Sequence, residues 1–243
     1  MIKRIRFATR RPDVPLDTFA SVWRAAAAGP GAAPPDVAPV RRVVATALPE
    51  ALAAPRHDGV GIEWFSDVGH LQRYEAWLQA AEADARPEGL RAVIDVEDSP
   101  VVVARELVLR GSDWLEDRWR QGGDRVKHMA LARRAAGLTP EEFQERWQNR
   151  AGQLRSPTTG EVVVIPDRAR GHAYVQNHPL PPGPDGVDWA YDAVNEVYFD
   201  DVEALQQRIE WLAENLGSGT EDDLVSQSWF LSVREEVVLG VTS

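Results

Sequence analysis

Residues 57–78 read HDGVGIEWFSDVGHLQRYEAWL, and residues 191–212 read YDAVNEVYFDDVEALQQRIEWL. The two stretches align without a gap at an offset of 134, and nine of the 22 positions carry the same residue. With ordinary amino-acid usage, unrelated stretches of this length would share about one or two. The repeat therefore predicts that the chain folds as two copies of one structural unit.

The repeat extends to both ends of the unit. Residues 2–23 align with residues 126–147 at an offset of 124, and both stretches end in tryptophan. Residues 101–109 align with residues 231–239 at an offset of 130. Because the three matched stretches occur in the same order, we interpret the chain as a tandem duplication.

The unmatched stretch between the copies sets the domain boundaries. We predict a degenerate N-terminal module at residues 1–110, a linker at residues 111–124 and a C-terminal module with the functional pocket at residues 125–243. At 243 residues, the chain has the length of two such modules.

Each half shows the same pattern of predicted elements. Alternating apolar residues predict four strands a half, with helices after the first and third. The predicted strands are residues 3–10, 40–47, 59–65 and 101–109, then 125–134, 169–177, 193–199 and 231–239. The stretch LTPEEFQERW begins a helix, with Thr139 as N-cap, Pro140 in the first turn and Glu142 completing a capping box. Asp67 and Asp201 open the later helices.

The order βαββαβ is that of a ferredoxin-like unit. One such sheet carries helices on a single face and leaves its other face bare, so two copies can cover each other. We predict an α+β fold in which two tandem ferredoxin-like βαββαβ modules form an intramolecular pseudo-dimeric α+β barrel. Because this closure is internal, we expect a monomer or a weak homodimer.

Composition excludes several classes of function. The net charge of −11 disfavours a nucleic-acid partner, since an acidic surface repels phosphates. The absence of cysteine excludes thiolate nucleophiles, disulfides and cysteine-based metal sites. No apolar run approaches the about 20 residues of a membrane span, and the start MIKRIRFATRR lacks the apolar core of a signal peptide. We expect a cytoplasmic protein without a membrane partner.

Three segments of the C-terminal half resemble a known family. They are FQERWQNRAGQL (143–154), RARGHAYVQNHPLPPGP (168–184) and YDAVNEVYFDDVEALQQ (191–207). These are similar to the EthD family of the dimeric α+β barrel superfamily, in which a Tyr-x-Gln-x-His-like run precedes a DGxxExxFD strand and a DxxAL helix. The resemblance implies a barrel that acts on small molecules without a bound cofactor.

The chain departs from the family pattern at one helix. The family usually has W-x-x-x-H-x-P-L there, whereas this chain has Ala151 and Gln153 at the His and Pro positions, and Ala27 in the first half. The QNH run of residues 176–178 corresponds to ATA at residues 45–47 in the first half. We therefore place any chemistry in the C-terminal half.

The strand before the Pro-rich loop supplies most candidate catalytic residues. Residues 172, 174, 176 and 178 share one face of the strand. This face either lines a cavity or is exposed to solvent. Exposure is an alternative because we expect the strand to lie at the edge of the sheet. Histidine can exchange protons near neutral pH, Asn and Tyr can donate to a substrate oxygen, and a buried glutamate can be a base with raised pKa. The predicted catalytic residues are His178, His172, Asn177, Tyr174 and Glu196.

Aromatic residues are the candidates for substrate contact. The predicted substrate-binding residues are Trp147, Trp189, Tyr191 and Trp229, with packing as the alternative for each. The repeated pairs Asp58 with Asp192 and Arg10 with Arg134 are instead expected to be structural, through turns and ion pairs.

The histidines do not predict a metal site. His172 and His178 lie roughly 20 Å apart along an extended strand, too far to share an ion. A haem with one axial histidine stays an alternative. No phosphate-binding glycine motif is present, and we predict no cofactor.

These observations favour a cofactor-independent cyclase, dehydratase or isomerase, acting on an aromatic or polyketide-like small molecule in secondary metabolism or catabolism. His178 would be its acid–base residue. The alternatives are a cofactor-free monooxygenase, a barrel that binds ligands or partners without catalysis, and a haem-binding barrel.

Overall fold

The computed structural model describes residues 1–27, 33–49, 51, 55–84, 88–122, 124–150, 154–155, 160–181, 187–216 and 223–239. The elements follow in the order β1 (Ile2–Arg10), α1 (Leu16–Ala27), β2 (Arg41–Ala47), β3 (Gly59–Phe65), α2 (Val68–Asp84), α3 (Glu88–Val93), β4 (Ile94–Asp95), β5 (Val101–Arg110), α4 (Ser112–Gln121), β6 (Arg125–Arg134), α5 (Pro140–Arg150), β7 (Leu154–Arg155), β8 (Val162–Val163), α6 (Asp167–Arg170), β9 (Ala173–Pro179), β10 (Ala193–Phe199), α7 (Val202–Leu216) and β11 (Val225–Leu239).

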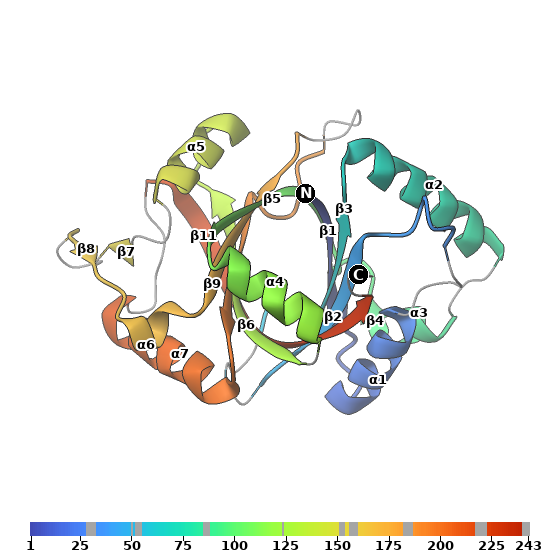
Figure 1. Ribbon diagram of the computed structural model, residues 1–243, viewed down its shortest axis with the longest axis horizontal. Helices are drawn as coiled ribbons and strands as arrows, with labels where there is room; N and C mark the ends of the chain where they lie inside the picture. The colour runs from blue at the N-terminus through green and yellow to red at the C-terminus, as the bar shows by residue number, and fades with distance from the viewer. Residues whose placement is uncertain are drawn as a thin grey trace.

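The main sheet closes on itself. Its strand order is β3-β2-β11-β6-β10-β9-β5-β1, β1 pairs back with β3, and the short β4 joins β1 at one end. All pairings are antiparallel. The long helices lie outside the ring, with α1 and α2 on one side and α5 and α7 on the other (Figure 1). The structure is thus an α+β barrel.

The two halves of the chain contribute equivalent strands. Within each half, the second, third, first and fourth strands are neighbours, which is the ferredoxin-like order. The halves join where β5 pairs with β9 and β11 pairs with β2. The predicted fold class is confirmed. The prediction that the strand of residues 172–178 is a sheet edge is wrong, because β5 takes up the edge that an isolated unit would expose.

The strand registers correct two sequence alignments by one residue. Val194 pairs with Asn177 while its repeat partner Val60 pairs with Ala45, so the QNH run corresponds to residues 44–46. In the same way Ile2 pairs with Arg105 and its repeat partner Val126 pairs with Arg234, an offset of 129 between the last strands. The correction matters because a one-residue slip moves every side chain to the other face of a sheet.

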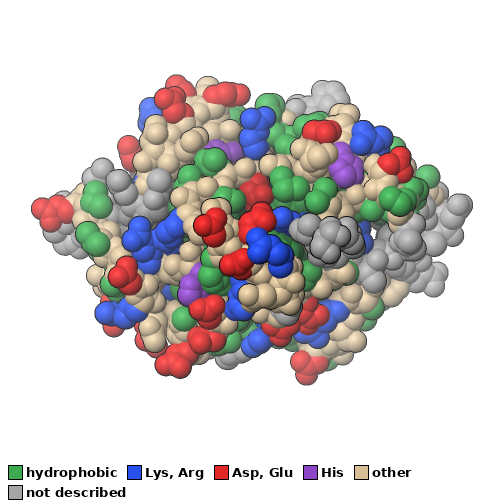
Figure 2. Space-filling view, viewed as in Figure 1, with side chains coloured by type: hydrophobic (Ala, Val, Ile, Leu, Met, Phe, Trp, Pro, Cys, Tyr) green, Lys and Arg blue, Asp and Glu red, His purple; other side chains and the backbone are tan. Residues whose placement is uncertain are grey.

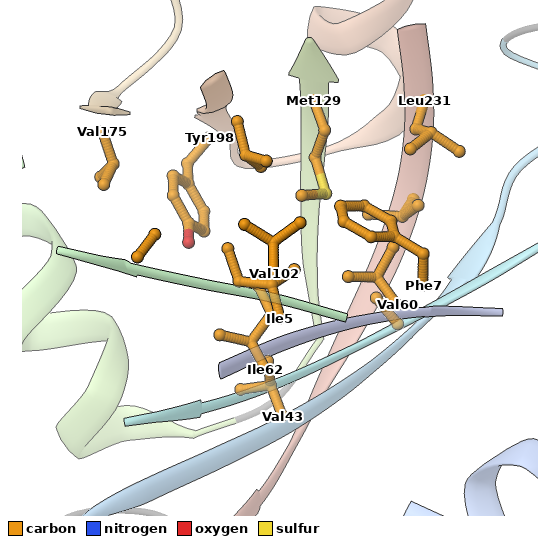
Figure 3. Close-up of a cluster of buried hydrophobic side chains, with 14 of the residues drawn as sticks. Ile5, Phe7, Val43, Val60, Ile62, Val102, Met129, Val175, Tyr198 and Leu231 are labelled. Atoms are coloured by element: carbon orange, nitrogen blue, oxygen red, sulfur yellow. The ribbon is translucent and has the colours of Figure 1, made fainter. Parts of the chain in front are cut away.

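The interior of the barrel contains a large cluster of apolar side chains. Side chains from both halves meet there, including Ile5, Val60, Val102, Met129 and Leu231 (Figure 3). The predicted linker contains α4, which lies across the barrel in Figure 1. Its residues Leu115 and Trp119 join the same buried cluster. The segment between the halves therefore helps to fill the core as well as connecting them.

The predicted capping box and the repeated Arg and Asp residues make hydrogen bonds and ion pairs in the structure. The Thr139 N–H donates to Glu142 Oε2 at 2.9 Å and the Glu142 N–H donates to Thr139 Oγ1 at 3.2 Å, which confirms the capping box. Arg10 Nε donates to Asp58 Oδ1 at 3.0 Å, and Arg134 makes the equivalent ion pair with Asp192. These repeated pairs tie the first strand of each half to the turn before its third strand.

One predicted boundary is displaced. The strand predicted from residue 169 begins at Ala173, because α6 occupies residues 167–170 and Gly171 turns the chain with a φ of 72°. A side chain at position 171 would meet Val197 Cγ1 at 2.5 Å.

None of the described helices is long and apolar enough to cross a membrane.

Candidate functional site

A connected group of polar side chains lies between β9, β10 and α5, outside the barrel. We call Trp147, Tyr174, Gln176, His178 and Asn195 the outer polar cluster. Trp147 Nε1 donates to Asn195 Oδ1 at 3.1 Å, and Asn195 Nδ2 donates to the Tyr174 hydroxyl at 3.1 Å. Gln176 Nε2 donates to the same hydroxyl at 3.0 Å and to the Trp147 carbonyl at 3.2 Å. The cluster links the helix that resembles the EthD pattern to the sheet.

Hydrogen bonding fixes the proton on His178. Its Nε2 lies 3.0 Å from Gln176 Oε1, which can only accept, so Nε2 carries the hydrogen. The orientation of the Gln176 amide is set in turn, because its nitrogen donates to the backbone carbonyl of Trp147. Burial lowers the pKa of His178, so the ring is neutral at pH 7 and Nδ1 keeps its lone pair. A neutral imidazole of this form can accept a proton.

Tyr174 is poised to donate a hydrogen bond. Its hydroxyl oxygen accepts from Gln176 and Asn195, so the hydroxyl hydrogen is left for another acceptor. Burial raises the pKa of this phenol, which therefore stays protonated at neutral pH. Tyr174 and His178 are four positions apart along the strand, or about 13 Å. The two groups would contact different parts of a bound molecule.

The equivalent place in the N-terminal half is filled by packing. Trp23 lies where Trp147 lies in the other half, fully buried, with its Nε1 donating to the Ala45 carbonyl at 3.1 Å. Its ring covers Gly59 and Gly61, whose missing side chains make room for it. Gly61 is the repeat partner of Asn195. The polar cluster is therefore a property of the C-terminal half and is not required by the fold.

Glu196 and Asn177 lie on the opposite face, inside the barrel. Glu196 accepts from Lys3 Nζ at 2.5 Å, Lys127 Nζ at 2.6 Å and Asn177 Nδ2 at 2.9 Å. The Tyr198 hydroxyl donates to it at 2.7 Å. Burial opposes ionisation of this carboxyl, but the charges and hydrogen bonds of Lys127 and Lys3 outweigh it, so its pKa is lowered. The expectation of a raised pKa at Glu196 is wrong.

The same interior holds a balanced set of charges, which we call the barrel charge cluster. Its cations are Lys3, Arg125 and Lys127, and its anions are Glu106, Glu196 and Glu235. All except Glu106 have fully buried side chains. The Arg125 guanidinium also stacks 3.9 Å from the centroid of the Trp119 ring of α4. With three charges of each sign, the cluster is electrically neutral.

A chain of hydrogen bonds through His57 lies near one end of the barrel. The Thr9 hydroxyl donates to the Asp98 carbonyl at 2.7 Å, so it accepts from His57 Nδ1 at 2.7 Å. His57 Nε2 must then accept from the Tyr191 hydroxyl at 2.5 Å. Burial, followed by the charge of Arg56, lowers the pKa of His57 to about 4. His57 and Tyr191 are repeat partners, so the contact joins equivalent points of the two halves.

The remaining predicted residues lie apart from the outer polar cluster. His172 precedes β9, pairs with Asp200 at 2.5 Å and stacks on Trp114 with ring centroids 4.9 Å apart. Trp189 and Trp229 are partly buried and pack against the barrel core. Of the nine predicted site residues, His178, Tyr174 and Trp147 thus belong to the outer polar cluster, whereas Asn177 and Glu196 meet inside the barrel.

Two members of the outer polar cluster were absent from the predicted site. Gln176 shares a strand face with His178, and Asn195 aligns with a glycine of the other half; both signals are visible in the sequence.

The positions of Ala151 and Gln153 lie outside the described residues. Within the described ranges, no group of three or more His, Asp or Glu side chains is arranged to hold a metal ion.

Residues 135–213 match the family model of the EthD domain. The match confirms the resemblance inferred for the C-terminal half, and the EthD domain so defined contains α5, β9, β10 and the whole outer polar cluster. It does not include β6 or the N-terminal half.

Solved structures of low similarity span the whole chain. One is provisionally described as a monooxygenase from Lactobacillus acidophilus NCFM, with 11% identity, 99% of this chain and 97% of that chain covered, and a TM-score of 0.45. Another is provisionally described as a chlorite dismutase, with 10% identity, 97% and 94% coverage, and a TM-score of 0.38. Similarity at this level says nothing about activity. No curated protein matches the chain.

Proposed function

We propose that the protein is a cofactor-independent enzyme that uses His178 for acid–base catalysis on an aromatic or polyketide-like small molecule. The observation that carries the proposal is the outer polar cluster in the EthD domain, set against the apolar packing of Trp23 in the other half. A structural role common to both halves would not need a polar network in only one of them.

The proposed chemistry follows from the protonation states. The neutral His178 ring removes a proton from the substrate through Nδ1, while its Nε2–H stays hydrogen-bonded to Gln176. Tyr174 donates its hydroxyl hydrogen to a substrate oxygen, where charge develops. Trp147, which is hydrogen-bonded to Asn195, supplies an aromatic side chain to the same cluster. Cyclisation, dehydration and isomerisation all begin with such a proton transfer.

Replacement of His178 tests the proposal. Purified wild-type protein and the variant His178→Gln are incubated with a panel of aromatic polyketides and β-keto compounds, and products are followed by mass spectrometry. We expect turnover of the responsive compound to fall about 100-fold or more in the variant, the usual contribution of a positioned acid–base group.

The matched control is Thr46→Ala, because Thr46 is the residue of the N-terminal half that corresponds to His178. Its activity should equal that of the wild type. Unchanged turnover in His178→Gln would refute the assignment, and oxygen consumption during turnover would favour a cofactor-free monooxygenase that uses the same base.

A further inference from the structure

An arginine from the N-terminal half stands beside His178. In the pairing of β5 with β9, Arg105 lies directly opposite His178. Directly opposite residues of an antiparallel pair have Cβ atoms about 4.5–5.5 Å apart and project from the same face. Arg105 therefore lies on the outer side of the barrel, at the edge of the outer polar cluster. Figure 1 shows β5 between α5 and α2.

The guanidinium of Arg105 is exposed and has no ion pair or side-chain hydrogen bond with any described residue. His178 is only partly buried, so the two side chains lie where the cluster meets solvent. Arginine presents a planar fork of donors that matches a carboxylate. An unpaired fork next to a neutral imidazole is suited to an anionic ligand.

The pseudo-symmetry of the barrel provides a comparison. Arg234 is the residue of β11 that corresponds to Arg105, and it lies opposite Thr46, the residue that corresponds to His178. Arg234 Nη1 lies 3.6 Å from Asp124 Oδ2, so this arginine has a carboxylate of the protein as its partner. Of these two equivalent arginines, Arg105 is the one without a carboxylate partner among the described residues. The acidic and basic side chains on the face shown in Figure 2 are otherwise interspersed.

We propose that Arg105 is the anchor for an anionic group of the substrate, a carboxylate or the enolate of a β-dicarbonyl compound, and so holds the substrate against His178. The inference rests on the proposed function, because it concerns the same site. It makes the site a joint product of both halves: the base comes from the EthD domain and the anchor from the N-terminal half. It also narrows the substrate class to anionic aromatic or polyketide-like compounds.

Binding of a matched pair of probes tests the anchor. Salicylate and its neutral amide, salicylamide, are titrated into full-length protein labelled with ¹³C in the histidine rings, and the His178 signal is followed by NMR. We expect salicylate to bind the wild type about tenfold more tightly than salicylamide, the effect of one charge-assisted contact. In Arg105→Gln the preference should fall to about one, and Arg105→Lys should recover part of it.

Arg234→Gln is the matched control and should keep the wild-type preference. A preference that survives in Arg105→Gln, or a wild type that binds neither probe or both equally, would overturn the anchor. Failure of the proposed function has a different signature, namely turnover that persists in His178→Gln whatever the binding results. The two outcomes are measured independently.

Discussion

Replacing Glu196 by glutamine gives the sharpest test of how the barrel interior is held together. The carboxylate accepts hydrogen bonds from Lys3, Lys127, Asn177 and Tyr198, with no exposure to solvent. The variant keeps the shape of the side chain but removes its charge. The barrel charge cluster then has three cations and two anions, because the wild type has three of each.

The expected loss follows from that imbalance. Removing one member of a buried ion pair leaves an uncompensated charge away from water, which costs about 3–5 kcal/mol. We therefore expect the free energy of unfolding of Glu196→Gln to be lower by about that amount at pH 7. Combining it with Lys3→Met restores equal numbers of opposite charges. The double variant should lose at least about 1 kcal/mol less than the sum of the two single variants.

Urea denaturation followed by tryptophan fluorescence measures these free energies. Because the pKa of Glu196 is lowered in the folded state, its contribution is fully present above the unfolded pKa, near 4.5. The contribution is lost as pH falls from there through the folded pKa, so the wild type and the variant should converge in acid. A variant within about 1 kcal/mol of the wild type at pH 7, or additive single and double variants, would refute the reasoning.

Three other predictions concern single contacts. Gly59→Ala places a Cβ 2.8 Å from Trp23 Nε1 and should lower the free energy of unfolding by about 1–3 kcal/mol. The control Gly89→Ala places a Cβ with nothing within 4 Å and should be neutral or slightly stabilising. Thermal melts compare the two variants. Thr139→Ala removes the N-cap of α5 and should cost about 1 kcal/mol in urea denaturation. The pKa of His57 is lowered to about 4, so its neutral form stabilises the fold above pH 6.5, and this stability is lost as the pH falls toward 4. In His57→Gln, the loss of unfolding free energy between these pH values should be about 2–3 kcal/mol smaller than in the wild type. The same pH dependence of stability in both proteins would contradict this prediction.

Much of the fold could be predicted from the amino-acid sequence. The repeats of Asp58 with Asp192 and of Arg10 with Arg134 predicted structural roles, and the structure shows that Arg10 pairs with Asp58 and Arg134 with Asp192. The predicted residues of β3 and β10 are confirmed, because each strand is a short run with β-branched and aromatic residues that follows a loop and ends shortly before an aspartate. The alignments of the second and fourth strands were off by one residue, because the register of a strand is set by its pairing with neighbouring strands and not by identities within a short stretch.

The candidate site was only partly predictable. The shared face of Tyr174, Gln176 and His178 follows from strand geometry alone. Arg105 could not be placed beside His178, because the pairing of β5 with β9 joins residues that are 73 positions apart and belong to different halves. The role of Glu196 was also hidden, because its pKa depends on Lys3 and Lys127, which only the closed barrel brings within hydrogen-bond distance.

The sequence by itself determined the duplication, the order of the main strands and long helices, the helix caps and the type of barrel, because these depend on local periodicity and on short-range hydrogen bonds. The tertiary structure alone decided which face of each strand is enclosed, which charges meet inside the barrel and which arginine stands beside His178. Those outcomes depend on the register between strands far apart in the chain. A shift of one residue would exchange the inside for the outside.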